Sequence, residues 1–180
     1  MKKIIILDRD GVINYDSLYY IKNPDELHAI PGSLEAIAEL NRAGFQVVVA
    51  TNQSGIARGF YDEPMLNEIH KKMHHELAAV GGHIDEIFFC PHLPTENCEC
   101  RKPNPGLLLQ IQKKYQINLA NVFFIGDKLS DVQAARAVGC KPLLVMTALE
   151  KLDVENNQEL KGVPWFSDLS EAVKYVITAS

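Results

Sequence analysis

The chain has 180 residues, of which 47% are apolar and 23% are charged, a composition that suits one globular domain with a substantial core. Its net charge of -5 argues against non-specific binding to nucleic acid or to anionic membranes, whose phosphates attract clustered lysine and arginine. No apolar run approaches the roughly 20 residues of a membrane-spanning helix, and Met1 leads straight into an apolar strand rather than a signal peptide, so we expect a cytoplasmic protein.

The first predicted element is a strand over residues 4–7, an apolar run too short for a helix. Asp8 and Asp10 follow it, and because residues two apart in an extended chain point to the same side, both carboxylates face one point. That point lies beyond a strand's carboxyl end, where open α/β sheets bind ligands, and Gly11 lets the chain turn there. Two such carboxylates favour one ionised and one protonated group, a nucleophile and a general acid, unless a cation lies between them. Alternatively, one aspartate caps a turn and the other is solvated.

Strands and helices alternate along the rest of the chain. We expect helices over residues 34–44, 63–80, 105–115, 131–138 and 169–177, strands over residues 46–50, 84–89, 122–125 and 141–145, and irregular structure over residues 147–164. Short loops between such elements imply right-handed crossovers and a mostly parallel sheet with helices on both faces. We therefore predict a single α/β, Rossmann-like domain over residues 1–180, without a large cap domain because no long insertion interrupts the pattern.

The loop after the second predicted strand reads TNQSG and offers hydroxyl and amide groups at Thr51, Asn52, Gln53 and Ser54. Gly55 permits a close approach of the backbone, so this loop can hold phosphate oxygens through N–H groups and side chains. The same residue types are common in ordinary turns, and a simple turn is the alternative interpretation.

The loop after the third predicted strand, CPHLPTENCECRKP, contains a candidate zinc site. Its possible ligands, spaced C-x-H-x5-C-x-C, are Cys90, His92, Cys98 and Cys100. Two extended pairs that each project their ligands to one side complete a tetrahedral Cys3His site. Four protein ligands leave no open position, so the zinc would be structural and would clamp the loop over residues 90–102. Unrelated buried thiols are the alternative, and Cys140, which lies far off, is expected to be an ordinary core cysteine.

Arg101 and Lys102 follow the cysteine-rich loop directly and precede Pro103. Lys102 can neutralise a phosphoryl group and an attacking carboxylate together, because its ammonium is a compact point charge. Arg101 can donate paired hydrogen bonds to two substrate oxygens. Both cations are therefore candidates for contact with a phosphorylated substrate.

The loop after the fourth predicted strand adds a third carboxylate, Asp127. Carboxylates of Asp8 and Asp127 and the backbone carbonyl of Asp10 are hard oxygen ligands that suit octahedral Mg²⁺, which keeps water ligands and binds a substrate phosphate. We therefore predict a catalytic Mg²⁺ at this edge. Asp131 is expected to cap the next helix or to support the site from behind rather than bind the metal. Lys128 can reach a substrate.

In chain order, DRDG, TNQSG, RKP and IGDKLSD resemble the four motifs of the haloacid dehalogenase (HAD) superfamily of phosphotransferases. Within it, CPH with CECRKP, NQSGIARG and IGDK resemble the heptose bisphosphate phosphatases over nearly the whole chain. Histidinol-phosphate phosphatases share the zinc loop and CRKP but usually differ after TNQ, and they are the alternative group. The resemblance implies a monomeric, Mg²⁺-dependent enzyme that removes the C7 phosphate of D-glycero-D-manno-heptose 1,7-bisphosphate in the supply of heptose for lipopolysaccharide.

The mechanism that we expect has two steps. Asp8 attacks phosphorus to form an aspartyl-phosphate, and Asp10 protonates the leaving sugar oxygen and then activates water. Thr51 and Lys102 hold the phosphoryl oxygens as the charge shifts. By resemblance, the residues that contact substrate are Asp16, Ser17, Leu18, Tyr19, Thr51, Asn52, Gln53, Ser54, Arg101, Lys102 and Lys128.

An alternative from another class of function is a zinc-clamped phosphosugar-binding module without turnover. Intact Asp8 and Asp10 argue against such a module, because two carboxylates that face an anion do not help to bind it. Magnesium-dependent release of phosphate distinguishes the two hypotheses.

His70 and His74 lie four residues apart on a predicted helix, a spacing that zinc sites use. Lys71 and Lys72 lie between them, and no carboxylate motif is nearby. We therefore expect a solvated helix face rather than a second metal site.

Overall fold

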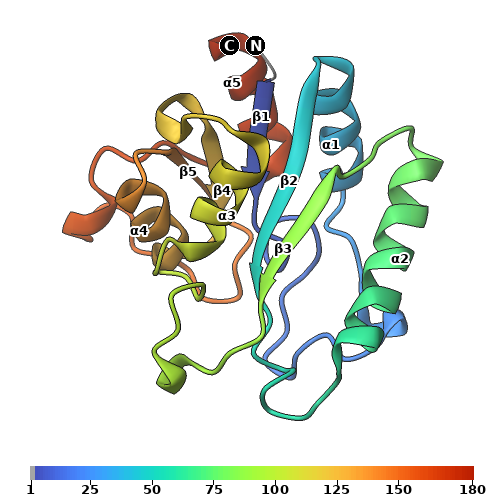
Figure 1. The fold of residues 1–180 in the computed structure, drawn as a ribbon. Coiled ribbons are helices and arrows are strands. Elements are labelled where there is room, and N and C mark those ends of the chain that lie inside the picture. Colours follow the sequence, from blue (N-terminus) through green and yellow to red (C-terminus); the bar gives the residue numbers. More distant parts are fainter. Residues whose placement is uncertain (1–2) are drawn as a thin grey trace.

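In a computed structural model, which describes residues 3–180, the chain forms one fully parallel sheet with helices on both faces (Figure 1). The strands are β1 (Lys3–Leu7), β2 (Phe45–Asn52), β3 (Glu86–Cys90), β4 (Phe123–Gly126), β5 (Lys141–Val145) and β6 (Trp165–Phe166). Their order in the sheet is β3-β2-β1-β4-β5-β6. The direction of winding therefore changes beside β1, which is where open parallel sheets bind ligands.

The helices are α1 (Ser33–Arg42), α2 (Glu63–Ala79), α3 (Gly106–Tyr115), α4 (Leu129–Ala137) and α5 (Leu169–Ala179). Alternate residues of β1 pack into different cores. Ile5 and Leu7 pack with α1, α2 and α5, whereas Ile4 and Ile6 pack with α3 and α4 (Figure 1). Both faces of β1 are therefore covered, which explains why its sequence is continuously apolar rather than alternating.

The predicted elements are confirmed, with small shifts at their ends. β3 begins at Glu86 rather than at residue 84. α4 begins at Leu129 rather than at residue 131, and its N-cap residue is Lys128 and not Asp131. Asp131 is the third residue of that helix, and its Oδ2 accepts the backbone N–H groups of Asp127 and Lys128 at 3.1 and 3.0 Å. Its carboxylate thus caps the helix from inside the first turn.

The segment over residues 147–164 is irregular apart from one short 3-10 turn, as expected. The strand that follows it, β6, was not predicted, because two residues carry too little pattern to distinguish a strand from a loop. Among the described residues, none of the helices has the length and apolar character needed to cross a membrane.

The loops that follow β1, β2, β3 and β4 meet at one edge of the sheet, the lower edge in Figure 1. β1 pairs with β2 on one side and β4 on the other, and the N–H of Asp8 continues the second ladder by donating to the backbone oxygen of Ile125 at 2.9 Å. The fold thus places Asp8 at the middle of this edge.

Candidate active site

Asp8 follows β1 directly, and only 6% of its surface is exposed. Its Oδ1 accepts the backbone N–H of Arg9 at 2.7 Å, and its Oδ2 pairs with Lys102 Nζ at 2.9 Å. Burial raises the pKa of Asp8 to about 6, although Lys102 opposes the rise, and Asp131 adds to it. The carboxylate is thus desolvated and held by fixed contacts.

Lys102, which follows the cysteine-rich loop, is buried beside Asp8. Its Nζ also contacts Asp131 Oδ1 at 2.7 Å and the backbone oxygen of Ala50 at 2.9 Å. Burial opposes a charge here, but Asp131 and Asp8 raise the pKa of Lys102. The amide of Asn52 fixes the Lys102 backbone through two reciprocal hydrogen bonds, each 3.1 Å long. Asn52 therefore holds the loop that carries Lys102 in place, in addition to lining the site.

Asp10 is surrounded by side-chain donors. Arg9 Nη2 and Asn14 Nδ2 donate to its Oδ1 at 2.8 and 2.9 Å, and Gln53 Nε2 donates to its Oδ2 at 2.9 Å. Burial alone would raise the pKa of Asp10, but Arg9 and these hydrogen bonds lower it. The resting site therefore favours ionised Asp10 and raises the pKa of Asp8. This is the reverse of the expected protonated general acid, because Arg9 and the hydrogen bonds lower the pKa of Asp10 while burial raises that of Asp8.

The TNQSG loop belongs to the site and is more than a turn. Gln53 Nε2 donates to Thr51 Oγ1 at 3.0 Å as well as to Asp10, and Gln53 Oε1 accepts from the Tyr61 hydroxyl at 2.6 Å. Because the Thr51 oxygen accepts from Gln53, its own hydrogen can point to a phosphate oxygen. Tyr61 packs across Gly55, where a Cβ would lie 2.2 Å from the ring. Gly55 thus makes room for the tyrosine that orients Gln53.

Asp127, which follows β4, forms an acidic cluster with Asp8 and Asp131, whose ligand atoms all lie within 4.8 Å of one another. Both Asp127 oxygens are buried without a hydrogen-bond partner among the described residues. Burial, then Asp131 and Asp8, raise the pKa of Asp127 to about 9. Orphaned carboxylate oxygens in such a cluster fit a hard divalent cation such as Mg²⁺. Asp131 is already engaged by Lys102 and by the first turn of α4, which favours a supporting role for it.

Gly11 is required by this cluster as well as by the turn. Its φ of 80° is in the left-handed region, and a Cβ at this position would lie 2.0 Å from Asp127 Oδ2. A larger residue would push Asp127 out of the cluster.

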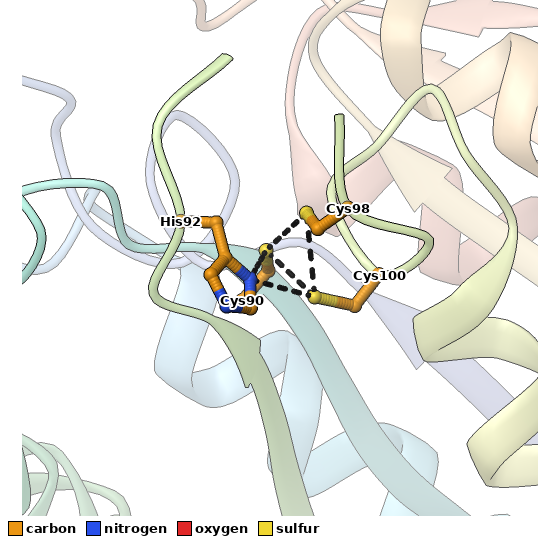
Figure 2. A group of neighbouring side chains, drawn as sticks. All are labelled: Cys90, His92, Cys98 and Cys100. Atoms are coloured by element: carbon orange, nitrogen blue, oxygen red, sulfur yellow. Dashed lines mark hydrogen bonds between the residues drawn. The ribbon is translucent and has the colours of Figure 1, made fainter. Parts of the chain in front are cut away.

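The cysteine-rich loop brings its four predicted ligands together (Figure 2). Cys90 Sγ lies 3.4 Å from His92 Nδ1, 3.5 Å from Cys98 Sγ and 2.9 Å from Cys100 Sγ. His92 Nδ1 lies 3.3 Å from Cys100 Sγ, and the cysteines form no disulfide. A tetrahedron with zinc–sulfur bonds of about 2.3 Å has sulfur–sulfur edges of about 3.8 Å. The separations of Cys98 Sγ from Cys90 Sγ and Cys100 Sγ, 3.5 and 3.6 Å, are close to this value, and the Cys90–Cys100 separation is shorter.

Asp8, Asp10 and Lys102, described above, line a cavity of about 480 Å³. The predicted site residues that line it are Asp8, Asp10, Asp16, Ser17, Leu18, Thr51, Asn52, Gln53, Ser54, Arg101, Lys102 and Lys128. Lys128 Nζ pairs with Asp16 Oδ2 at 2.7 Å, which connects the loop after β4 to the loop after β1. Tyr19 does not line this cavity, and 80% of its surface is exposed.

Sequence reasoning missed several residues around Asp10. Arg9, Asn14 and Tyr61 were given no role, and only the position of Arg9 between two aspartates offered a signal. The prediction of a solvated face was wrong for His70, which is buried with its Nε2 3.2 Å from Arg9 Nη1. His74 is exposed, as predicted. Cys140 is a buried core residue, also as predicted.

Known proteins similar to this chain include a protein family, curated relatives and a solved structure. The HAD-hydrolase-like family model matches residues 99–172. A D-glycero-beta-D-manno-heptose-1,7-bisphosphate 7-phosphatase of Bordetella bronchiseptica is 56% identical over 145 residues, which are 81% of each chain. The enzyme of the same name from Pseudomonas putida is 49% identical and aligns over 97% of this chain and 99% of its own length.

A solved structure resembles the whole chain. The crystal structure of D,D-heptose 1,7-bisphosphate phosphatase from B. bronchiseptica, complexed with magnesium and phosphate, has a TM-score of 0.94 and 47% identity, and the alignment covers 99% of each chain.

Proposed function

The chain belongs to the D-glycero-beta-D-manno-heptose-1,7-bisphosphate 7-phosphatases of the HAD superfamily, and we propose on this basis that it hydrolyses the C7 phosphate of that heptose bisphosphate. One observation carries the proposal. Asp8, buried at the end of the central strand, is paired with buried Lys102 and faces a cavity that Asp10 also lines. A fixed carboxylate, a cation and a second carboxylate are the groups that transfer of a phosphoryl group to aspartate requires.

Asp8 is the proposed nucleophile. One of its oxygens forms a bond to phosphorus as the bond from phosphorus to the sugar oxygen breaks, which leaves an aspartyl-phosphate. The contacts from Lys102 and from the N–H of Arg9 fix the direction of this carboxylate, and burial removes water that would otherwise solvate it. Orientation of this kind lowers the barrier, because the reacting atoms are held at attack distance.

Asp10 is the proposed acid and base. In the first step it donates a proton to the leaving sugar oxygen, and in the second it takes a proton from the water that hydrolyses the aspartyl-phosphate. The donors around Asp10 favour its ionised form at rest. A phosphate dianion that arrives beside it opposes ionisation, so the proton is taken up as the substrate binds.

Thr51 and Lys102 are proposed to stabilise the transferring phosphoryl group. Lys102 is held between Asp8 and Asp131, so its charge is in position before the substrate arrives. Thr51 is buried and its hydroxyl hydrogen can be donated to a phosphoryl oxygen. Preorganised donors of this kind need no reorganisation as charge develops.

Asp8, Asp127 and the backbone carbonyl of Asp10 are proposed to hold Mg²⁺. A bound Mg²⁺ would supply positive charge that draws the phosphate toward Asp8 and offsets its repulsion from the carboxylates. The unpartnered oxygens of Asp127 support this assignment.

Cys90, His92, Cys98 and Cys100 are proposed to bind a structural zinc ion. The convergence of three sulfur atoms and one nitrogen atom supports it, because four protein ligands satisfy tetrahedral zinc. The ion would hold a loop over residues 90–102 that contributes Arg101 and Lys102 to the cavity.

We propose further that the enzyme is a monomer and that it works in the cytoplasm. Free thiols stay reduced in that compartment and are available to bind metal. The cavity residues Asp16, Ser17, Leu18, Asn52, Gln53, Ser54, Arg101 and Lys128 are proposed to contact the substrate, and Tyr19 to do so only if its loop moves toward the cavity.

The proposed function is tested by phosphate release from D-glycero-beta-D-manno-heptose 1,7-bisphosphate, with histidinol phosphate measured in parallel. We expect release from the heptose that requires Mg²⁺, stops with a chelator and is absent in Asp8→Asn. Release from histidinol phosphate alone would keep the mechanism but overturn the substrate. Tight binding of the heptose without release would indicate a binding protein instead.

A further inference from the structure

Arg9 is the largest fully buried side chain in the described part of the protein, with 1% of its surface exposed. Removal of a guanidinium from water is unfavourable unless its hydrogen bonds are replaced. The hydrogen-bond partners that replace water around Arg9 are Asp10, Gln53 and His70. Nε and Nη2 reach Asp10 Oδ1 at 3.2 and 2.8 Å, Nη2 reaches Gln53 Oε1 at 3.4 Å, and Nη1 reaches His70 Nε2 at 3.2 Å.

His70, a residue of α2, contacts Nη1, the nitrogen of the Arg9 guanidinium that does not contact Asp10. A guanidinium only donates hydrogen bonds, so His70 Nε2 must accept and the ring must be neutral, with its proton on Nδ1. Burial, helped by the neighbouring Arg9, lowers the pKa of His70 to about 3. His70 is thus a fixed acceptor near neutral pH and leaves the other nitrogens of Arg9 directed to Asp10.

Tyr61 fixes the side chain of Gln53 in the same way that His70 fixes that of Arg9. Its hydroxyl donates to Gln53 Oε1 at 2.6 Å, which sets the orientation of the amide. The amide nitrogen must then point to Asp10 Oδ2 at 2.9 Å and to Thr51 Oγ1 at 3.0 Å. Without Tyr61, a flip of the amide would bring its oxygen against the Asp10 carboxylate.

We propose that Arg9 and Gln53 are positioning residues for Asp10, and that His70 and Tyr61 fix these two side chains from the protein interior. This inference rests on the proposed function. Each Asp10 oxygen is held by a donor that is itself anchored on its other side, so the carboxyl group keeps one orientation toward the leaving oxygen. A misplacement of about 1 Å can lower a rate about 100-fold, which is why such outer contacts matter.

A positioning role differs from a general structural role in its dependence on the leaving group. A sugar alkoxide is a poor leaving group and needs the proton from Asp10, whereas 4-nitrophenolate leaves without one. The ratio kcat/KM reports only the steps up to formation of the aspartyl-phosphate, so the later use of Asp10 as a base does not affect it. Loss of positioning should therefore lower kcat/KM for the sugar phosphate much more than for 4-nitrophenyl phosphate.

The test compares Tyr61→Phe and His70→Leu with wild type on both substrates. Matched controls are Tyr115→Phe and His74→Leu. Tyr115→Phe removes a hydroxyl at the end of α3 that lies 3.5 Å from Glu86 Oε2 of β3, and His74→Leu replaces an exposed histidine one turn further along α2. We expect about a 10- to 100-fold fall in kcat/KM for the heptose bisphosphate, carried by kcat with KM little changed, and a fall below about threefold for 4-nitrophenyl phosphate. The controls should keep wild-type values.

His70→Leu also leaves Arg9 Nη1 without a partner and can lower the folded fraction. His70→Gln covers that case, because a glutamine oxygen can accept from Arg9, and we expect it to restore most of the lost activity. Equal losses on both substrates, or no loss in Tyr61→Phe and His70→Leu, would overturn the positioning role. A wild type that is inactive on both substrates would instead overturn the proposed function and this inference with it.

Discussion

Lys102 Nζ lies 2.9 Å from Asp8 Oδ2 and 2.7 Å from Asp131 Oδ1, and the lysine is 3% exposed. One buried cation thus compensates two buried anions. Removal of one member of a buried ion pair leaves a charge without water or partner. The group that we assign to phosphoryl binding is therefore also important for the stability of the fold.

Lys102→Met should accordingly lower both stability and activity. We expect the free energy of unfolding to fall by about 3–5 kcal/mol, because Asp8 and Asp131 lose their cation while the side-chain volume is nearly kept. Urea unfolding at pH 7 measures this change, and phosphate release measures the activity. A loss below about 1 kcal/mol, typical of an exposed pair, would show that water reaches these carboxylates.

Asp8→Asn and Asp10→Asn should differ in residual activity. Asp8→Asn removes the attacking oxygen, so we expect no aspartyl-phosphate and no measurable turnover. Asp10→Asn removes acid and base catalysis, which is typically worth about 100- to 10,000-fold, so a slow and folded enzyme should remain. Rates for both variants, with circular dichroism as the control for folding, make the comparison. Similar and mild losses in the two variants would contradict the assigned roles.

Zinc content should depend on the cysteine cluster alone. We expect wild-type protein to hold one zinc ion per chain by elemental analysis, and Cys98→Ser to hold far less, because the site loses one of four ligands. Cys140→Ala is the matched control, since Cys140 is buried in the core outside the cluster. Thermal unfolding of Cys98→Ser should begin at lower temperature, as metal binding contributes to folding. Equal zinc in all three proteins would place the metal elsewhere.

The stability of the protein should depend on pH through His70. Its pKa in the folded state, about 3, is below the value of 6.5 for an unperturbed histidine. Neutral His70 therefore contributes stability that is complete above about pH 6.5 and is lost progressively as pH falls toward 3. Carboxylates titrate in the same range, so the difference between wild type and His70→Gln isolates this contribution.

We expect the urea midpoint of wild type to fall more between pH 7 and pH 5 than that of His70→Gln, with His75→Gln, which changes an exposed histidine of α2, behaving as wild type. Parallel falls in all three proteins would show that His70 is already solvated in the folded state.

The sequence predicts the sheet well because β1, β2, β4 and β5 are short apolar runs separated by helices of clear periodicity. It also predicts which loops meet, because the carboxyl ends of parallel strands share one edge. The acidic cluster follows from this rule, since Asp8 and Asp127 come directly after β1 and β4, whereas the cysteine cluster was predicted from the spacing of its ligands.

The contacts between side chains from distant elements could not be predicted in the same way. Burial of His70 depends on how α2 is rotated about its axis relative to Arg9. The neighbouring Lys71 and Lys72 instead indicate a solvent-exposed helix face. The contact between Tyr61 and Gln53 likewise depends on the path of the loop before α2. The lowered pKa of Asp10 likewise depends on its contacts with Arg9, Asn14 and Gln53, which spacing rules do not predict.

The reciprocal hydrogen bonds between Asn52 and the Lys102 backbone have a consequence for variation among related chains. They anchor Lys102 to the end of β2, in addition to the cysteine cluster that is proposed to hold the same loop. Changes over residues 93–97, between the proposed ligands His92 and Cys98, should therefore leave the Lys102 backbone in place. The lysine proposed to bind the phosphoryl group is thus attached to the sheet itself, through Asn52 and Ala50, and not only to the loop that carries it.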